Sequence, residues 1–345
     1  MDLPGLGLHF VSADLPSLAC GLVAAQPRAA VLDLSGEQWL SQLAGVEFDG
    51  ELRSYSAVPD ALALWQQLEP RLGDWLQLLE LQALQPLLIP PLPGVDMLLR
   101  CLVLAEALEQ GADLTVLLPA PAEALALLEL ARTGPALVET LLEPLLGWWD
   151  QTRQSLASLE LVLRLRLPSS ASLRLDPRWR SRLEHMAALL APGGPWQLSL
   201  ALECAGPKAE LLRQRLSCLS ARGFMPTRLG LHGPAAAAVL AQRPDWWPAQ
   251  LPGVELAYPF ASDAVEALLH LEATGLEVCM DAAAGTLRMP LPGVIKAELD
   301  VQQSATTVVL LVGGQRRLVN VPASLAGKTC SGARLESGWL ELRFL

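Results

Sequence analysis

The stretch LHFVSADLPSLACGLVAAQPRAAVLDL, residues 8–34, holds two apolar runs separated by a segment of helical composition. Residues 8–12 form an apolar run that ends in a polar turn, which is typical of a buried strand. Residues 15–25 predict a helix, and Pro16 is tolerated because it falls in the first turn. Residues 29–34 predict a second buried strand. A strand, a helix and another strand within about 30 residues indicate the start of a βαβ unit.

The same alternation continues to about residue 280 and predicts an α/β fold with a mostly parallel sheet flanked by helices. Further strands are expected at residues 86–90, 113–118, 196–202 and 227–232. Helices are expected at residues 61–84, 96–110, 122–132, 135–161, 208–221 and 261–272.

The composition changes after about Asp281. No convincing helix is found from residue 287 to the last residue, and short alternating runs take its place, separated by Gly-Gly, Pro and Ser-Gly turns. This pattern predicts a small all-β sandwich. We therefore expect two domains, an α/β domain over residues 1–281 and a β-sandwich over residues 282–345. The expected strands of the sandwich are residues 296–301, 306–312, 317–321, 330–335 and 339–344.

Charge and hydropathy exclude several classes of protein. The 345-residue chain has a formal net charge of -11, which argues against a nucleic-acid partner, because such a partner requires a basic face. Its uncharged runs reach about fifteen residues, short of the ~20 that span a bilayer, so no transmembrane segment is expected. No basic residue precedes Arg28, so the N-terminus does not resemble a signal or transit peptide.

The cysteines and histidines predict no metal site. The six cysteines show no C-x-x-C spacing, and the four histidines are far apart in the sequence. Scattered cysteines in a long chain are typical of a reducing compartment, so we expect a cytoplasmic protein.

The connection after the first strand lacks the groups that hold phosphate. It has no glycine before Gly21 and no lysine, and Asp14 places a negative charge where a phosphate would bind. The first lysine of the whole chain is Lys208. Gly327-Lys328-Thr329 resembles the end of a phosphate loop, but Pro322 replaces the required glycine and strand follows it. No nucleophile motif is present, so we assign no catalytic, cofactor-binding or metal-ligating residue and expect no cofactor.

Two aromatic pairs, Trp148-Trp149 and Trp246-Trp247, have two interpretations. One is packing in a core or interface. The other is the wall of an apolar groove for a partner helix.

The order of elements resembles the arsenite-pump and tail-anchored-protein-targeting ATPases, the ArsA-like family with a P-loop-NTPase-like fold. In that family PG-x-x-E precedes a helix and the strand YDVVVVDTAPTGH. Here Pro93-Gly94-Val95-Asp96 leads into a helix, and Ala120-Pro121 fit the Ala-Pro. The family's Asp, Thr and Gly fall on Leu118, Pro119 and Glu123. Leu146-Gly147-Trp148-Trp149 resembles the LPELLDWW that follows.

Other family positions are changed too. The base-binding Asn falls on His232, and the switch aspartate after the second strand is replaced by Ser35. The resemblance therefore implies a degenerate member in which every nucleotide-contacting position is lost.

The C-terminal segment resembles the α-crystallin domain of small heat-shock proteins. The matching motifs are Leu291-Pro292-Gly293-Val294, Asn320-Val321-Pro322 and the run ARLESGWL at residues 333–340. The chain ends at Leu345 without the hydrophobic tail that joins small heat-shock subunits, so we expect this domain to dock on its own chain.

The resemblance implies a non-hydrolysing pseudo-ATPase that acts as a protein-binding or chaperone-like module. Residues 122–167, which are rich in leucine, would face a hydrophobic client or a partner subunit, and the family suggests a homodimer. The alternative is a nucleotide-binding ATPase with an unusual site or an intact paralogue as partner. A third possibility is a structural subunit whose helices pack only on themselves. Asp14 separates the first two hypotheses: turned inward over the pocket, it would exclude nucleotide.

Overall fold

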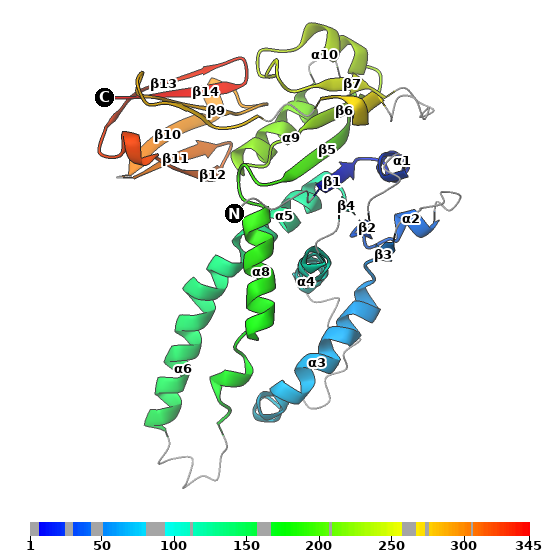
Figure 1. Ribbon diagram of the computed structural model, residues 1–345, viewed down its shortest axis with the longest axis vertical. Coiled ribbons are helices and arrows are strands. Elements are labelled where there is room, and N and C mark those ends of the chain that lie inside the picture. Colours follow the sequence, from blue (N-terminus) through cyan, green and yellow to red (C-terminus); the bar gives the residue numbers. More distant parts are fainter. Residues whose placement is uncertain are drawn as a thin grey trace.

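A computed structural model describes residues 7–24, 30–42, 51–80, 94–110, 113–156, 167–206, 209–256, 267–272, 276–304 and 306–345. Seven parallel strands form one sheet in the order β3-β2-β4-β1-β5-β6-β7 (Figure 1). Their bounds are β1 (Leu8–Ala13), β2 (Ala30–Asp33), β3 (Leu52–Ser54), β4 (Leu114–Leu117), β5 (Trp196–Glu203), β6 (Arg228–His232) and β7 (Gly253–Glu255). The predicted mostly parallel sheet is confirmed.

Helices cover both faces of this sheet. The helices are α1 (Pro16–Ala24), α2 (Trp39–Gln42), α3 (Ala57–Leu78), α4 (Val95–Glu109), α5 (Pro121–Leu137), α6 (Glu143–Ser155), α8 (Pro177–Leu189), α9 (Glu210–Ala221) and α10 (Ala236–Gln242). On one face Val11 and Ala13 pack with α1 and with Leu268. On the other face Phe10 packs with α4, α5, α8 and α9. The layers therefore follow from strands that are buried on both sides.

Local sequence signals set several helix starts. Pro121 and Pro177 occupy the first turns of α5 and α8, where the missing N–H costs nothing. The Asp176 side chain caps α8 by accepting from the backbone N–H of Arg178 at 2.8 Å. Gly94 precedes α4 with a φ of 82°, a conformation that favours glycine.

Three helices extend away from the sheet and form a helical lobe of α3, α6 and α8 (Figure 1). The single helix expected at residues 135–161 is divided in the structure, because α5 continues into a π-helix, η2 (Val138–Leu142), before α6 begins. Pro144, at the start of α6, has no N–H to donate to the carbonyl of Thr140, and its ring crowds that carbonyl, which accounts for the widened turn.

The C-terminal part is an antiparallel sandwich, as the sequence predicts. Its sheets have the orders β10-β11-β12 and β13-β14-β9-β8 and enclose a separate apolar core. The strands are β8 (Cys279–Asp281), β9 (Thr286–Pro290), β10 (Leu299–Ser304), β11 (Thr307–Val312), β12 (Gln315–Asn320), β13 (Cys330–Glu336) and β14 (Trp339–Phe344). The strand expected from residue 296 begins at Leu299, because residues 296–298 form a short 3-10 turn.

Some expectations concern residues that are not described. The strand at residues 86–90 lies outside the described residues, as does the first half of the helix at residues 261–272. None of the described helices combines the length and the apolar character needed to cross a membrane.

Candidate functional site

The carboxyl edge of the parallel sheet is where open α/β folds bind ligands, at the point where the chain turns to opposite sides. Here that point lies between β1, which leads through α1 to β2, and β5, which leads through α9 to β6. Only Asp14 and Leu15 connect β1 to α1. A connection of two residues without glycine is too short to form a loop of converging backbone N–H groups around a phosphate.

The side chain of Asp14 occupies this position and connects the end of β1 to β5 and α9. Its carboxylate accepts the backbone N–H of Glu203 at 2.7 Å and pairs with Arg215 of α9. Its own N–H donates to the carbonyl of Ala201 at 3.0 Å, so β1 stays paired to β5 up to the turn. The side chain is only 12% exposed. The carboxylate of Asp14 is therefore turned toward the end of β5 and toward α9.

The end of β1 is also tied to β4. The Ser12 hydroxyl donates to the carbonyl of Pro119 at 2.9 Å, and both groups are buried. The segment after β4 runs through Leu118 and Pro119 directly into α5 at Pro121. No carboxylate stands at the end of β4, where the resemblance would require the catalytic-region aspartate.

Asp33, the last residue of β2, is a carboxylate that the sequence analysis missed. It is 1% exposed and accepts the backbone N–H groups of Ser35 at 2.9 Å and Leu40 at 3.2 Å. Both oxygens therefore stabilise the turn into α2. The sequence signal for this carboxylate is an Asp at the end of an apolar run, two residues before Ser35, the residue that aligns with the family's switch aspartate.

A second polar cluster lies at the ends of β2 and β3. The hydroxyl of Tyr55 donates to Asp96 at 2.7 Å, and Arg100 pairs with Asp96 at 2.9 Å while donating to the carbonyl of Leu34 at 3.1 Å. Gly36 has a φ of 83°, and a Cβ there would lie 2.6 Å from Arg100, so the loop packs directly on the guanidinium. The cluster fixes α4 against the sheet.

The pKa values of two potentially reactive groups are shifted in favour of their neutral forms. Burial raises the pKa of the Cys20 thiol to about 12, and the charge of Asp33 adds to this rise. Burial lowers the pKa of His232, although Asp14 and Glu203 act in the opposite direction. Within the described ranges, no three His, Cys, Asp or Glu side chains are grouped to hold a metal ion.

The helix formed by α5, η2 and α6 carries apolar side chains on two opposite faces. Leu146 is buried, and Trp149 contacts Trp75 with ring centroids 5.0 Å apart. Leu137, Leu141, Leu145 and Trp148 point the other way, with 44–65% of each residue exposed. We call these four residues the outer stripe. A helix that is apolar on both faces normally has a partner on both.

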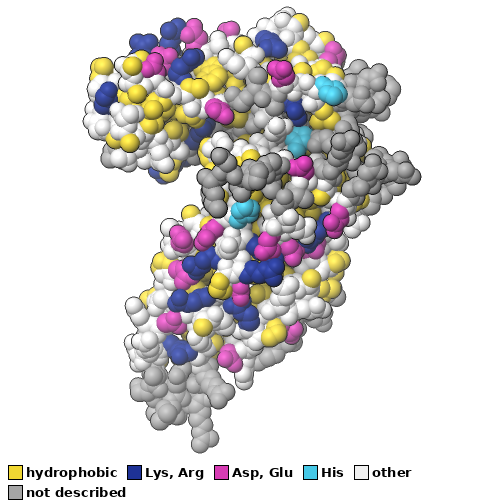
Figure 2. All heavy atoms as spheres, viewed as in Figure 1, with side chains coloured by type: hydrophobic (Ala, Val, Ile, Leu, Met, Phe, Trp, Pro, Cys, Tyr) yellow, Lys and Arg dark blue, Asp and Glu magenta, His cyan; other side chains and the backbone are white. Residues whose placement is uncertain are grey.

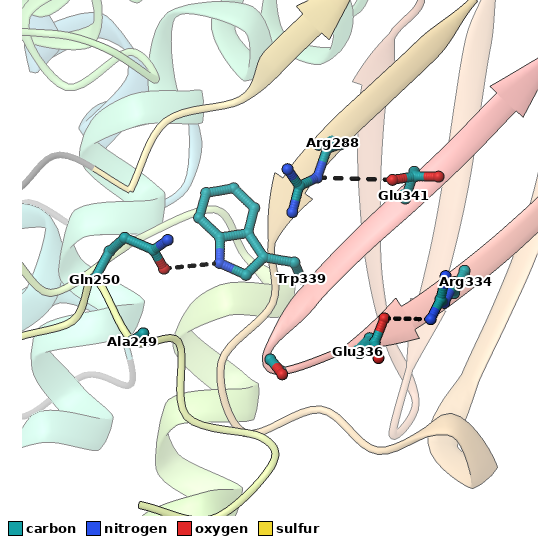
Figure 3. Close-up of a pocket in the computed structure, with 8 residues that line it drawn as sticks. Ala249, Gln250, Arg288, Arg334, Glu336, Trp339 and Glu341 are labelled. Atoms are coloured by element: carbon teal, nitrogen blue, oxygen red, sulfur yellow. Dashed lines mark hydrogen bonds and ion pairs between the residues drawn. The ribbon is translucent and has the colours of Figure 1, made fainter. Parts of the chain in front are cut away.

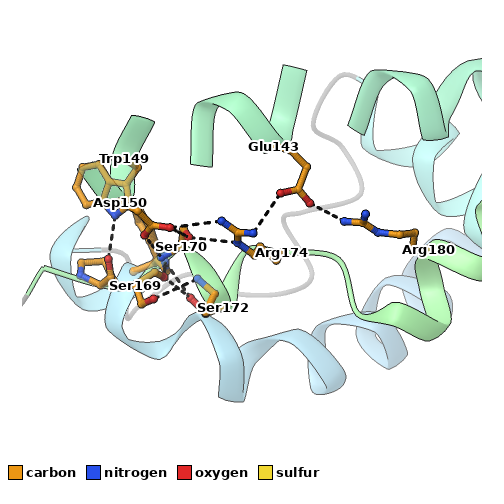
Figure 4. A network of polar contacts seen from close by, with 11 residues as sticks. Glu143, Trp149, Asp150, Ser169, Ser170, Ser172, Arg174 and Arg180 are labelled. Carbon is orange, nitrogen blue, oxygen red and sulfur yellow. Dashed lines mark hydrogen bonds and ion pairs between the residues drawn. The ribbon is translucent and has the colours of Figure 1, made fainter. Parts of the chain in front are cut away.

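The inner face of α6 is fixed by a polar network (Figure 4). Asp150 accepts from the hydroxyl of Ser170 at 2.5 Å and pairs with Arg174 at 3.4 Å. Glu143 pairs with Arg174 at 3.4 Å and with Arg180 at 2.6 Å. The indole N–H of Trp149 donates to the carbonyl of Pro168 at 2.9 Å. These contacts hold α6 against the start of α8 and keep the outer stripe outward.

The sandwich docks on α9, as expected. Arg213 is 7% exposed and donates to the carbonyl of Gly293 at 2.8 Å and to both carboxylate oxygens of Glu298 at 2.8 Å. Ser220 donates to the carbonyl of Pro292 at 3.1 Å, and Arg317 donates to that of Ser220 at 2.9 Å. Burial lowers the pKa of Arg317 to about 10, and the nearby charge of Arg132 contributes.

A shallow cavity of about 240 Å³ lies where the β13–β14 hairpin meets residues 249–250 (Figure 3). Its charged side chains pair with one another: Arg288 with Glu341 at 3.8 Å, and Arg334 with Glu336 at 2.6 Å. The indole of Trp339 donates to Gln250 at 3.1 Å. Because its charges are paired, the cavity offers no free charge to a ligand.

The segment Gly327-Lys328-Thr329, which resembles the end of a phosphate loop, lies in the sandwich. The backbone N–H of Lys328 donates to Leu325, and Thr329 exchanges hydrogen bonds with Leu345. No helix follows this segment, because β13 begins at Cys330.

Together these features define a chain with an open parallel α/β sheet, a projecting helical lobe and a docked β-sandwich. Residues 284–344 match the family described as an HSP20-like domain found in ArsA, which confirms the small heat-shock-like domain expected for this part and supports the resemblance to ArsA there. Over 320 residues the chain is 29% identical to an uncharacterized protein of Streptomyces coelicolor, a match that covers 83% of this chain and 78% of that protein.

Proposed function

We propose that this chain is a non-hydrolysing, ArsA-like pseudo-ATPase that acts in the cytoplasm as a protein-binding, chaperone-like module for hydrophobic segments. The outer stripe is the observation that carries the proposal. Its four residues recur at intervals of four, four and three along one helix, which is the spacing of an apolar seam for a helical partner.

Neighbouring helices of the lobe support this interpretation. The outward positions of α8 include Arg178, Ser181, Glu184 and His185, and those of α3 include Gln66, Glu69 and Asp74. Side chains of both signs gather over the lobe (Figure 2), and Val58 is also exposed on α3, whereas α5–α6 exposes three leucines and a tryptophan along one helix. A row of exposed apolar residues of this kind is typical of an interaction surface.

The state of the carboxyl edge supports the non-hydrolysing half of the proposal. Phosphoryl transfer requires a phosphate cradle and a cation close to the developing charge. At the corresponding position this chain has the two-residue turn, the inward carboxylate of Asp14 and the Arg215 that pairs with it. The binding role then relies on a permanent surface and not on a nucleotide-driven change.

Peptide binding tests the proposed role in binding hydrophobic segments. A fluorescent peptide of about 20 residues with an apolar helical face should bind to the purified protein and lose at least tenfold in affinity with Leu141→Glu. Leu318→Glu is the matched control, because Leu318 is 60% exposed on the sandwich and is not part of the stripe. Equal binding by both variants and the parent would contradict the proposed surface.

Thermal unfolding with millimolar Mg-ATP or Mg-ADP tests the second half. A ligand at 100 times its Kd stabilises by roughly 2.7 kcal/mol, which shifts the Tm by several degrees at about 2–4 °C per kcal/mol. We expect no shift. A clear shift would favour the alternative, a nucleotide-binding ATPase with an unusual site or a paralogous partner.

A further inference from the structure

Arginines from two parts of the chain gather where α9 ends. Because α9 leads from β5 to β6, its last turn lies at the amino edge of the parallel sheet, opposite the turn that holds Asp14. Arg132 reaches this place from α5 and donates to the carbonyl of Arg222 at 2.5 Å. Arg317 reaches it from β12 and donates to the carbonyl of Ser220 at 2.9 Å. The α/β part and the sandwich therefore each bring one guanidinium to the end of α9.

The two guanidiniums of Arg132 and Arg317, which we call the arginine pair, lie on the same side of Gly223. A Cβ on Gly223 would lie 3.4 Å from Nη1 of Arg132 and 3.6 Å from Nε of Arg317, so these two nitrogens are at most about 7 Å apart. Neither nitrogen donates a hydrogen bond within the described part of the chain. Both remain open to solvent, since neither belongs to the fully buried polar atoms that lack a partner. Arg132 also lies over the ring of Phe224 at 4.2 Å, which fixes its guanidinium before any ligand binds.

The positive charge of the arginine pair is not balanced. Among the described residues no carboxylate forms an ion pair with Arg132 or Arg317, and Glu129, one turn before Arg132 on α5, pairs instead with Arg222 at 2.8 Å. The C-terminus of α9 offsets about half an elementary charge, whereas the pair carries two. Burial lowers the pKa of both guanidiniums, and the charge of Arg132 adds to the effect on Arg317. Capping of α9 therefore accounts for the two hydrogen bonds that are made, but leaves an excess of positive charge.

We propose that the arginine pair binds a small tetrahedral oxyanion, phosphate or sulfate. A guanidinium presents its donors in a planar fork that suits such oxygens, with charge-assisted bonds of about 2.7–2.9 Å. One ion can bridge two nitrogens that are at most about 7 Å apart, and a dianion matches the excess charge. The bound ion joins α5, the end of α9 and β12, so it stabilises the docking of the sandwich. This site is separate from the outer stripe and goes beyond the proposed function.

Calorimetric titration of the full chain with inorganic phosphate, at constant ionic strength, tests the site. We expect one ion per chain and at least tenfold weaker binding by Arg132→Gln and by Arg317→Gln, because each variant loses a charge and its charge-assisted donors. Arg316→Gln is the matched control and should bind as the parent does. It removes the same charge from the next position of β12, where the exposed side chain points to the opposite face of the strand.

Two further arms sharpen the test. Arg317→Lys keeps the charge and a donor for the carbonyl of Ser220 but loses the fork, so it should fold as the parent does and still bind phosphate severalfold more weakly. Sulfate should compete with phosphate, whereas acetate, with one charge, should not. Equal binding of acetate and phosphate would overturn the assignment to a dianion.

The inference fails if the parent binds no phosphate, or if Arg132→Gln and Arg317→Gln bind it as tightly as the parent. A loss in Arg316→Gln equal to that in Arg317→Gln would also overturn it, because surface charge alone would then attract the ion. These results are independent of peptide binding at Leu141, so either proposal can fail alone. Stabilisation by Mg-ATP that Arg317→Gln abolishes would belong to the arginine pair, and stabilisation that this variant retains would belong to the carboxyl edge.

Discussion

At the scale of single residues, Asp14 stabilises the turn after β1 through its contacts with Glu203 and Arg215. Asp14→Ala leaves the N–H of Glu203 and the guanidinium of Arg215 without their acceptor in a partly buried place. We expect a loss of about 2 kcal/mol in the free energy of unfolding, measured by urea denaturation. Asp14→Asn keeps an oxygen for Glu203 and should cost less. Equal stability of the parent, Asp14→Ala and Asp14→Asn would show that the contacts of Asp14 do not stabilise the fold.

Gly293 belongs to the LPGV motif and has a φ of 81°. A Cβ there would lie 2.3 Å from the carbonyl oxygen of Arg213 and 2.5 Å from the backbone nitrogen of Ser217. Gly327 has nearly the same φ, 82°, but open space around it. Gly327→Ala should cost only the left-handed penalty of about 1–2 kcal/mol, whereas Gly293→Ala should cost clearly more and loosen the sandwich from α9. Thermal unfolding of the two variants separates backbone strain from collision.

His232 gives the chain a pH dependence of known sign. Its pKa is lowered in the folded state by burial, so between its two pKa values the unfolded chain binds more protons. The free energy of unfolding should therefore fall as the pH drops below about 6.5, by at most ~1.4 kcal/mol per unit. His232→Gln should flatten this slope between pH 7.5 and 5.5 in urea denaturation. An unchanged slope would assign the effect to another group.

At the scale of elements, the position of α6 depends on polar contacts more than on a core. Asp150 accepts from Ser170 and pairs with Arg174, and Ser170 donation is the main reason that the pKa of Asp150 is lowered. Asp150→Ala should accelerate amide hydrogen exchange in α6 severalfold and leave α4 unchanged. Exchange that rises equally in both helices would indicate global destabilisation.

Elements were predictable from the sequence where burial gives a clear pattern. The strands β1, β4, β5 and β6 consist mostly of buried residues and are rich in apolar ones, and α4 and α9 have helical spacing. β3 and β7 were not predicted, because each is an edge strand of three residues, too short for a clear apolar pattern. The π-helix results from Pro144, which acts on the carbonyl of Thr140 within a continuous helix. The contacts of Asp14 could not be predicted from the sequence, because its partners Glu203 and Arg215 are about 200 residues away in the chain.

At the scale of the whole molecule, α9 belongs to two cores at once. Leu212, Leu216 and Leu219 pack with the parallel sheet, while Ala221 packs with the interior of the sandwich. Between these cores the seam is polar, with Arg213, Ser220 and Arg317 donating to backbone carbonyls across it. Directional contacts of this kind specify one docking geometry, in addition to the apolar contacts of Ala221.

Cooperativity between the two parts should therefore depend on Arg213. The parent should unfold in a single calorimetric transition, since the docked sandwich and the α/β part stabilise each other through α9. Arg213→Ala leaves Glu298 without its bidentate partner and should cost about 3 kcal/mol, enough to separate the melting of the two parts into two transitions. Arg213→Lys keeps the charge but loses the fork-shaped contact, so it should give an intermediate trace. If Arg213→Ala melts in one transition close to the parental Tm, the coupling lies in the apolar contacts of Ala221 and not in the guanidinium.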